Sequence, residues 1–558
     1  MPQYSLSESK KYLLLGLSFL LVAFGQPVWA WWTGLLSAAA GFALFWRVLL
    51  PISSKKERFC IAMGWYAGVQ MVQLGWFASH PYAYIYGVMF FCAWLMGSQL
   101  GLIALWIQPS SLKKLPVLFA LASLWTLLEW TRLFILSGLS FNPVGLSLSG
   151  SIYALQLASV GGVFFLSFWV MITNLFVLRA WLYGGSLKPV MAALFLILFP
   201  YAAGFFHYHY HAGQMLVKNE TLDVIVVQSA LPIEEYTGFA TAEELRAGVL
   251  KKWQRILGTT QKHIGKRADL IVLPEYVVPY GTYPAIFPIS SVQKLFLEVF
   301  GAAGSKALPD IKRPYADLVE TDKGKRWLVS NAYIVQSLAN LFQAHVIAGL
   351  EDSVYVDEEN SRFESYSSAF HFSPGSERGE RYEKRVLVPM GEYIPFEFCR
   401  KMAARYGISG SFTCGKEAKV FSGPIPCGPT ICYEETYGDL VRENRQKGAE
   451  LLVNLTNDGW YPHSRLPQQH FDHARLRTVE NGVPLVRSCN TGITGGLNSL
   501  GEVIAVLGPD HLQTQENPDS LRITVPKYHY QTLYSRLGDA LILSLCAGML
   551  LLPFIIRK

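Results

Sequence analysis

Long apolar segments separated by short polar loops fill the first 206 residues of this sequence, and one more segment closes it. Each segment is close to the roughly 20 residues that an α-helix needs to cross the hydrocarbon layer of a bilayer. Because unpaired backbone amides are not tolerated in lipid, the segments predict membrane-spanning helices. The eight segments lie at residues 11–25, 29–47, 59–78, 82–107, 115–136, 153–179, 189–206 and 538–556.

Lysine and arginine gather in alternate loops between these segments. The positive loops and ends contain Lys10, Lys11, Lys55, Lys56, Arg58, Lys113, Lys114, Arg179, Lys188, Arg557 and Lys558. Positively charged loops stay on the cytoplasmic side of a membrane. This pattern predicts that both termini are cytoplasmic and that the chain after the seventh segment lies outside the cytoplasm.

Between about residues 220 and 530 the apolar runs become shorter, and Pro, Gly and charges of both signs become frequent. Short runs of apolar, often β-branched residues predict strands at 224–228, 270–273, 344–349, 428–432, 451–454 and 484–488. Helical patterns lie between several of them, as at 241–264 and 468–481, and this alternation indicates an α/β fold with a layered sheet. The sequence thus predicts a membrane domain at 1–215, an extracytoplasmic α/β domain at 216–530 and a C-terminal membrane helix at 531–558.

Composition and cysteine usage exclude several classes of protein. With 51% hydrophobic residues, the chain is too apolar to be one soluble domain of ordinary composition. Its net charge of +7 lies largely at the ends of apolar segments, with no dense basic block, so nucleic acid is not an expected partner. The eight cysteines form no CxxC pair and no Cys/His cluster, which argues against a structural zinc site. Cys399 with Cys414 is the one pair suspected of forming a disulfide.

Cys432 stands where a strand is predicted to end and a turn leading to a helix begins. Such a turn holds one side chain out at the edge of a sheet. A cysteine there is a candidate nucleophile, because a partly ionised thiol attacks acyl carbon well. The alternative is a buried core cysteine, since free cysteines are among the most buried residues.

A thiol that performs acyl transfer needs a base to take its proton and a cation or amide dipoles to hold the oxyanion. Glu275 follows the predicted strand at 270–273, Lys384 precedes an apolar run, and Glu392 lies in a loop bounded by Pro and Gly. Each of these is alone compatible with an ordinary surface charge.

Four motifs in a fixed order are more specific than any single residue. They are Pro-Glu at 274–275, Tyr-x-Lys-x-x-Leu-Val-Pro-x-Gly-Glu at 382–392, Ile-Cys-Tyr-Glu at 431–434 and Asn-Asp-Gly-Trp at 457–460. This set resembles the carbon-nitrogen hydrolase (nitrilase) superfamily. With several spans before the domain and one after it, the whole chain is similar to the apolipoprotein N-acyltransferase family of the bacterial inner membrane.

The resemblance implies a four-layer αββα sandwich and a Glu-Lys-Cys triad without a metal or cofactor. Glu275 would be the general base, Cys432 the nucleophile and Lys384 the cation that steadies the tetrahedral intermediate. Glu392 matches a glutamate thought to support the base and the lysine, while Tyr433 and Glu434 match positions beside the nucleophile. The chain departs from the family pattern at Met390, where a Phe is usual.

The resemblance further implies a ping-pong acyltransferase. Cys432 would take a fatty acyl chain from a phospholipid as a thioester and pass it to the N-terminal amine of a diacylglyceryl-cysteine apolipoprotein. The protein would be a monomer of the inner membrane with its catalytic domain on the periplasmic side. One rival is a membrane-anchored amidase or nitrilase-like hydrolase with the same triad and water as acceptor. Another is a non-catalytic binding or assembly protein that retains the fold.

Other features leave alternatives open. Gln469, His470 and His473 predict helix packing rather than a metal site, because no further ligand follows at metal spacing. Arg477 and Glu480 are either helix-surface charges or a structural ion pair. Glu129 and Arg132 lie in an apolar segment, so they either pair with each other or form part of a lipid headgroup site.

Two further stretches of the α/β domain have alternative or provisional interpretations. The aromatic stretch 280–300 either packs on the domain or is a lid that dips into the bilayer. The glycine-rich run 490–496 predicts the turn of a hairpin.

Overall fold

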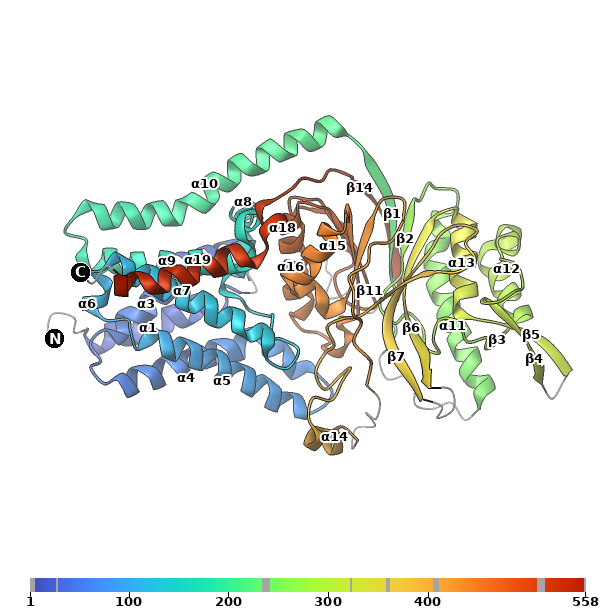
Figure 1. The fold of residues 1–558 in the computed structure, drawn as a ribbon, viewed down its shortest axis with the longest axis horizontal. Coiled ribbons are helices and arrows are strands. Elements are labelled where there is room, and N and C mark those ends of the chain that lie inside the picture. The colour runs from blue at the N-terminus through green and yellow to red at the C-terminus, as the bar shows by residue number, and fades with distance from the viewer. Residues whose placement is uncertain are drawn as a thin grey trace. The chain divides into compact units, whose positions relative to one another are not determined.

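The computed structural model describes residues 6–26, 29–232, 241–321, 324–357, 362–404, 411–508 and 517–555, and they form two compact units. The first, here called the helical unit, comprises Met1–Val217, His463–Gly482 and Tyr530–Lys558. The second, the sheet unit, comprises Lys218–Pro462 and Val483–His529. Figure 1 labels the helices of the first and the strands of the second.

A helix coincides with each of the eight predicted apolar segments of the described chain. Five helices are long and apolar enough to cross a membrane, and α19 is a shorter apolar helix. The fold-class prediction is confirmed, whereas the number of spans stays a prediction. The main helices are α1 (Glu8–Ala23), α2 (Trp31–Leu36), η2 (Ser37–Gly41), α3 (Phe42–Leu49), α4 (Lys55–Gln73), α5 (Tyr84–Ala104), α7 (Leu115–Thr131), α9 (Ala158–Tyr183), α10 (Leu187–Lys218), α16 (Leu466–Asn481), α18 (Leu533–Leu537) and α19 (Asp539–Ile555).

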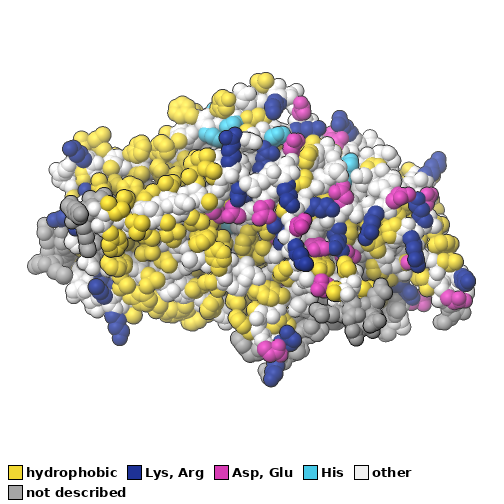
Figure 2. Space-filling model, viewed as in Figure 1, with side chains coloured by type: hydrophobic (Ala, Val, Ile, Leu, Met, Phe, Trp, Pro, Cys, Tyr) yellow, Lys and Arg dark blue, Asp and Glu magenta, His cyan; other side chains and the backbone are white. Residues whose placement is uncertain are grey.

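The surface of the helical unit is mostly apolar. Figure 2 shows hydrophobic side chains over most of its visible face. Phe90, Phe195 and Leu198 are among the exposed large hydrophobic residues of this unit. Large contiguous apolar surfaces are rare on proteins that meet water. The helical unit therefore has the surface expected of a protein embedded in lipid.

Two buried pairs of opposite charge lie inside the helical unit. Arg132 Nη1 lies 3.6 Å from Glu129 Oε1, and both side chains are buried. The same Glu129 oxygen accepts a hydrogen bond from the Val144 amide at 2.9 Å. Arg477 and Glu480 form a fully buried ion pair at 2.8 Å. Of the two alternatives for each pair, the structural ion pair is the one observed, because an unpaired charge among apolar helices would be costly.

Helix α16 belongs to the helical unit although the sequence places it between two strands of the sheet unit. Gln469 accepts a hydrogen bond from Trp76 Nε1 at 2.8 Å and donates one to Asn142. His470 and His473 lie edge-on to Phe141. The predicted packing role of these residues is thus observed, but the α/β domain expected at 216–530 does not keep this helix.

The first sheet of the sheet unit has six strands in the order β14-β1-β2-β6-β7-β8. Strands β1, β2 and β6 are parallel, and the remaining neighbours are antiparallel. The bounds are β1 (Thr221–Gln228), β2 (Leu270–Val272), β6 (His345–Asp357), β7 (Arg362–Phe372), β8 (Glu380–Glu383) and β14 (Asp519–Pro526).

The second sheet has five strands in the order β13-β12-β11-β10-β9, with β9, β10 and β11 parallel. Its bounds are β9 (Cys427–Ile431), β10 (Leu451–Thr456), β11 (Leu485–Cys489), β12 (Gly495–Leu497) and β13 (Val503–Val506). A small third sheet contains β3 (Phe287–Pro288), β4 (Ala316–Thr321) and β5 (Gly324–Val329). Strands β11 and β12 are antiparallel, as the predicted glycine hairpin requires.

Alternate residues of β1 belong to two different cores. Val224 and Val226 pack with Ile431 and Val453 of the second sheet. Ile225 and Val227 face the opposite core, which contains residues of α11 (Ala242–Thr260), α12 (Ile289–Lys306) and α13 (Asn331–Phe342). A strand buried on both faces needs a continuous apolar run, which explains why β1 was recognisable in the sequence. With α15 (Gly438–Gln446) packing against β9, the layers follow the predicted αββα order.

All six predicted strands of this region are present. The stretch 280–300 packs on the domain, because Phe287, Val292 and Phe296 are fully buried in the core that contains α12. Of its two interpretations, packing is therefore the one that the structure supports. Cys399 and Cys414 are both free cysteines, so the suspected disulfide is absent from the described chain.

Candidate active site

Cys432 directly follows β9 and has a backbone φ of 51°. A non-glycine residue in this left-handed region is strained, and such strain is common where a turn presents a reactive side chain. Asn454 Nδ2 donates to the Cys432 carbonyl at 3.4 Å and to Thr430 Oγ1 at 3.1 Å, which holds the turn from the neighbouring strand. The thiol is half-buried, as a nucleophile that must still meet a substrate should be.

Lys384 follows β8 and is completely buried. Its Nζ donates to Glu275 Oε1 at 3.0 Å and to Glu392 Oε1 at 2.6 Å. The other oxygen of Glu392 accepts from the Val388 amide at 2.9 Å, so the turn that carries Glu392 closes on itself. The three charged residues singled out in the sequence therefore meet in one largely buried cluster.

Glu275 is held by close packing of two backbone segments. It lies just past β2, and the Gly349 amide of β6 donates to the Pro274 carbonyl at 3.1 Å. A Cβ on Gly349 would lie 2.6 Å from Glu275 Cα, closer than atoms can approach. Gly349 therefore permits the approach that places the Glu275 carboxylate against Lys384.

The electrostatics of the cluster favour a protonated lysine. Burial alone would lower the pKa of Lys384, but Glu275 and Glu392 outweigh it, and the pKa lies well above the ordinary value. Burial raises the pKa of Glu275, Lys384 opposes this rise, and the negative charge of Glu392 adds to it. A carboxylate with a raised pKa holds a proton more readily, which suits a general base.

The thiol differs from the sequence-based expectation. Burial and the nearby Glu275 charge raise the pKa of Cys432, and Lys384 only partly offsets them. The side chain is therefore a neutral thiol near neutral pH, not the partly ionised nucleophile that the sequence suggested. Attack on an acyl carbon then requires that the thiol proton is removed during the reaction. Glu275 lies close enough to Cys432 for its charge to raise the pKa of the thiol.

Glu434 connects the cysteine turn to the lysine segment. Its carboxylate accepts hydrogen bonds from the Ile431 amide at 2.8 Å and the Arg385 amide at 2.5 Å. The Tyr382 hydroxyl lies 2.9 Å from both of its oxygens. Because Tyr382 and Arg385 flank Lys384 and Ile431 precedes Cys432, this one buried side chain fixes the position of both.

We expect Glu434→Gln to destabilise the folded protein and to disturb the arrangement of the candidate site. The amide that replaces one oxygen would face N–H and O–H donors, which leaves buried donors unpaired at a cost of about 3 kcal/mol. Thermal unfolding of the purified protein should begin at a lower temperature, and alkylation of Cys432 should change in rate. Glu443→Gln is the matched control, because the Glu443 carboxylate is partly exposed and binds the guanidinium of Arg385.

A second set of charged residues was not recognised from the sequence. Arg487 on β11 lies 2.8 Å from Glu435 and 3.8 Å from Asp458, and all three side chains are buried. In the sheet register Thr430, Asn454 and Arg487 lie side by side on β9, β10 and β11. The sequence does contain a signal for this set, because Arg487 lies inside a predicted buried strand and a buried charge needs a partner.

The remaining predicted residues have structural surroundings. Tyr433 is nearly buried, and its ring stacks edge-on against Tyr437 at 5.1 Å. Met390 is buried in the turn that carries Glu392. Within the described ranges no group of three or more His, Cys, Asp or Glu side chains could hold a metal ion.

The models of two known families match different parts of the chain. Residues 238–517 match the model of the carbon-nitrogen hydrolase family, and residues 18–176 match the model of the apolipoprotein N-acyltransferase N-terminal domain.

Curated relatives cover nearly the whole chain. The apolipoprotein N-acyltransferase of Chlamydia pneumoniae is 31% identical over 95% of this chain and 95% of that protein. The enzyme of the same name from Chlamydia caviae is 32% identical over 94% of this chain and 93% of that protein. Among solved structures, an amidase of the nitrilase superfamily from Nesterenkonia is 15% identical, with a TM-score of 0.31, over 55% of this chain and 90% of its own.

Proposed function

Because the chain belongs to the apolipoprotein N-acyltransferase family, we propose that it moves a fatty acyl chain from a phospholipid, through a thioester on Cys432, to a lipoprotein. The acceptor is the N-terminal amine of a diacylglyceryl-cysteine apolipoprotein. The observation that supports this proposal is the buried Lys384 ammonium, bonded to Glu275 and Glu392. This arrangement gives the thiol at Cys432 a base and a cation without a metal.

In the first half of the reaction, Glu275 takes the proton from Cys432 Sγ while the sulfur attacks the ester carbonyl carbon of the phospholipid. The negative charge that develops on the carbonyl oxygen is stabilised by the Lys384 ammonium. When the tetrahedral intermediate collapses, the C–O bond to glycerol breaks, and Glu275 returns its proton to the departing oxygen. A lysophospholipid leaves, and the acyl chain stays on sulfur.

In the second half, the lipoprotein amine attacks the thioester carbonyl carbon. Glu275 takes a proton from the amine nitrogen, the C–S bond breaks, and the proton passes to sulfur. The amide product and the free thiol result. Glu392 keeps Lys384 in place during both halves, since it binds the same ammonium from the other side.

The membrane helices explain why such a site is tethered. Both proposed substrates lie in the bilayer, so anchoring the enzyme there confines the search to two dimensions and supplies part of the positioning that accelerates reaction. The proposed topology has cytoplasmic termini and a periplasmic catalytic domain, because Lys and Arg follow alternate apolar segments.

Intact-mass measurement tests the proposal. The purified full-length protein, incubated with phosphatidylethanolamine, should gain the mass of one fatty acyl chain, and hydroxylamine should remove it. A synthetic diacylglyceryl lipopeptide with a free amine should discharge the label into an N-acylated product. If the label passes only to water, the site is that of a membrane-anchored amidase or hydrolase, which is the alternative function.

The pH dependence of acylation should report the environment of Glu275. Since the pKa of Glu275 is raised above its ordinary 4.5, activity should be lost as the pH falls through a value above 4.5. Glu392→Gln removes a charge that raises this pKa, so the acidic limb should move to lower pH. Rates of thioester formation at a series of pH values measure both effects. An unmoved limb in Glu392→Gln would exclude Glu275 as the titrating base.

A further inference from the structure

Arg487 is a fully buried arginine of β11 that the mechanism proposed above does not use. Its Nη1 donates to Glu435 Oε2 at 2.8 Å, and its Nη2 lies 3.8 Å from Asp458 Oδ2. None of the three side chains is more than 3% exposed. Burial would lower the pKa of Arg487, but its neighbours, Glu435 first among them, outweigh burial, so the pKa lies above its ordinary value. The guanidinium is therefore a permanent positive charge inside the sheet unit.

Glu435 connects this charge to the segment that presents the candidate nucleophile. It lies three residues after Cys432, in the short helix η7 (Cys432–Thr436). In the second sheet β11 and β9 are separated by β10 alone. The bond from Arg487 to Glu435 therefore crosses the neighbouring strand and fixes the residues that directly follow the thiol.

Asp458 follows β10 and is enclosed by the loop after β11. Its backbone amide donates to the Thr491 carbonyl at 3.0 Å. A Cβ on Gly492 would lie 2.7 Å from Asp458 Oδ2, so a glycine allows the loop to lie directly against the carboxylate. Asn490 Nδ2 donates to Asn457 Oδ1 at 3.1 Å and joins the same two strand ends. The backbone and the carboxylate of Asp458 are thus both held in place.

The charge of Asp458 acts on the thiol. Burial comes first among the influences that raise the pKa of Cys432, followed by the charges of Glu275 and Asp458, while Lys384 lowers it. A carboxylate at position 458 thus opposes ionisation of the thiol, and Arg487 is a cation within ion-pair distance of that carboxylate. Two further carboxylates of the site stay unchanged in every variant below: Glu392 and Glu434.

We propose that Arg487 is a positioning residue of the candidate active site, which holds the segments after β9 and β10 in place and offsets the negative charge that Asp458 brings to the thiol. It acts through Glu435 and Asp458 and not by contact with a substrate. An arginine suits this role, because its planar guanidinium presents several donors in a fixed geometry. The inference rests on the proposed function, since it takes Cys432 as the nucleophile.

The test removes the fully buried pair as a whole. Replacing both partners of a buried ion pair by neutral side chains of similar size often leaves a protein stable, so Glu435→Gln/Arg487→Met should fold. Asp458 then keeps its charge without the cation. Between about pH 9 and about pH 10, buried carboxylates are ionised. In this range alkylation of Cys432 by iodoacetamide, located by peptide mapping, should be about tenfold slower than in the native protein, because less thiolate is present.

Thioester formation is the second readout. In full-length Glu435→Gln/Arg487→Met incubated with phosphatidylethanolamine, it should slow by about tenfold or more, since the residues after the thiol are no longer held. Asp223→Asn/Arg522→Met is the matched control, because it removes a partly exposed pair of the same unit, 2.8 Å apart, that joins β1 to β14. The control should alkylate and acylate at the native rates, and thermal unfolding shows that each variant is folded.

Two further variants separate charge from position. Glu435→Gln/Asp458→Asn/Arg487→Met differs from the double variant only at position 458 and should alkylate at least as fast as the native protein, because the opposing charge is gone. Arg487→Lys keeps the charge but loses the planar group. It should alkylate at the native rate and still form the thioester more slowly.

Several results would overturn the proposal. These are a double variant that alkylates at the native rate, a triple variant that is as slow as the double variant, and an Arg487→Lys protein with an unchanged rate of thioester formation. The last result decides the question if the double variant does not fold. A native protein that alkylates at Cys432 but forms no thioester would contradict the proposed function instead, and the alkylation arms need no acyl transfer.

Discussion

Cys432→Ala should abolish both thioester formation and acyl transfer, with the rate falling by about 10⁴-fold or more. The substitution removes the atom that carries the acyl chain in the proposed mechanism, and neither Cys427 nor Cys489 of the same sheet is suited to replace it. Cys427 and Cys489 are completely buried, and burial raises the pKa of each thiol to about 12. The measurement is intact mass after incubation with phosphatidylethanolamine, together with N-acylation of a diacylglyceryl lipopeptide.

The matched control is Cys414→Ala. Cys414 is an exposed free thiol of the same unit and has no role in the proposed mechanism, so its loss should leave both readouts unchanged. The two proteins should also unfold at similar temperatures, since Cys432 is only half-buried. Acyl label that persists in Cys432→Ala would place the nucleophile elsewhere and refute the proposed function.

Glu275→Gln should slow acylation by about 10²–10⁴-fold, the usual contribution of a positioned general base. The effect depends on the raised pKa of Cys432, because a neutral thiol cannot attack until its proton is removed. A glutamine keeps the size of the side chain but cannot take the proton. Single-turnover rates of thioester formation measure the change.

This substitution has a second, distinguishable consequence. Removing the Glu275 charge also removes one of the influences that raise the pKa of Cys432, so the thiol should ionise at lower pH than in the native protein. Alkylation of Cys432 followed against pH should show this shift even though catalysis is lost. Glu351→Gln is the control, because Glu351 of β6 is a partly buried carboxylate that accepts a hydrogen bond from the Tyr276 hydroxyl. An unchanged acylation rate in Glu275→Gln would exclude it as the base.

Much of the architecture could be predicted because local patterns produce it. The spans follow from runs of apolar residues, and β1 follows from a run that is buried on both faces. The candidate residues Glu275 and Cys432 follow from their positions at the ends of predicted strands, and Lys384 follows from its position before an apolar run. Their ordered motifs then identified the family, which the comparisons confirm.

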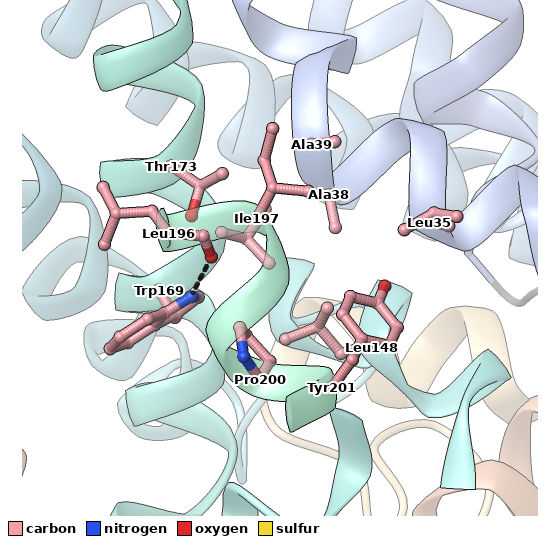
Figure 3. Close-up of a pocket in the computed structure, with 11 residues that line it drawn as sticks. Leu35, Ala38, Ala39, Leu148, Trp169, Thr173, Leu196, Ile197, Pro200 and Tyr201 are labelled. Atoms are coloured by element: carbon pink, nitrogen blue, oxygen red, sulfur yellow. Dashed lines mark hydrogen bonds between the residues drawn. The ribbon is translucent and has the colours of Figure 1, made fainter. Parts of the chain in front are cut away.

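Contacts between residues that are far apart in the chain decided the features of the fold that local patterns did not predict. Helix α16 is mostly polar and has no distinct apolar face, and its contacts with Trp76, Asn142 and Phe141 show that it belongs with the helical unit. The π-helical turn η2 needs Asn174 to bind its backbone, and the Leu196 carbonyl of α10 accepts its hydrogen bond from Trp169 of another helix (Figure 3). No periodic pattern in either segment predicts such pairings, because each partner lies far away in the chain.

The chemistry of the cluster around Lys384 was also determined partly by the sequence and partly by the tertiary structure. The sequence by itself determined which side chains carry a thiol, a carboxylate and an ammonium, since these are covalent properties of the residues. Whether the thiol is ionised depends on how much water and charge surround it, and the folded chain sets both. Burial of Cys432 and its closeness to Glu275 reverse the expectation of a partly ionised thiol, because a pKa is a property of an environment rather than of a residue.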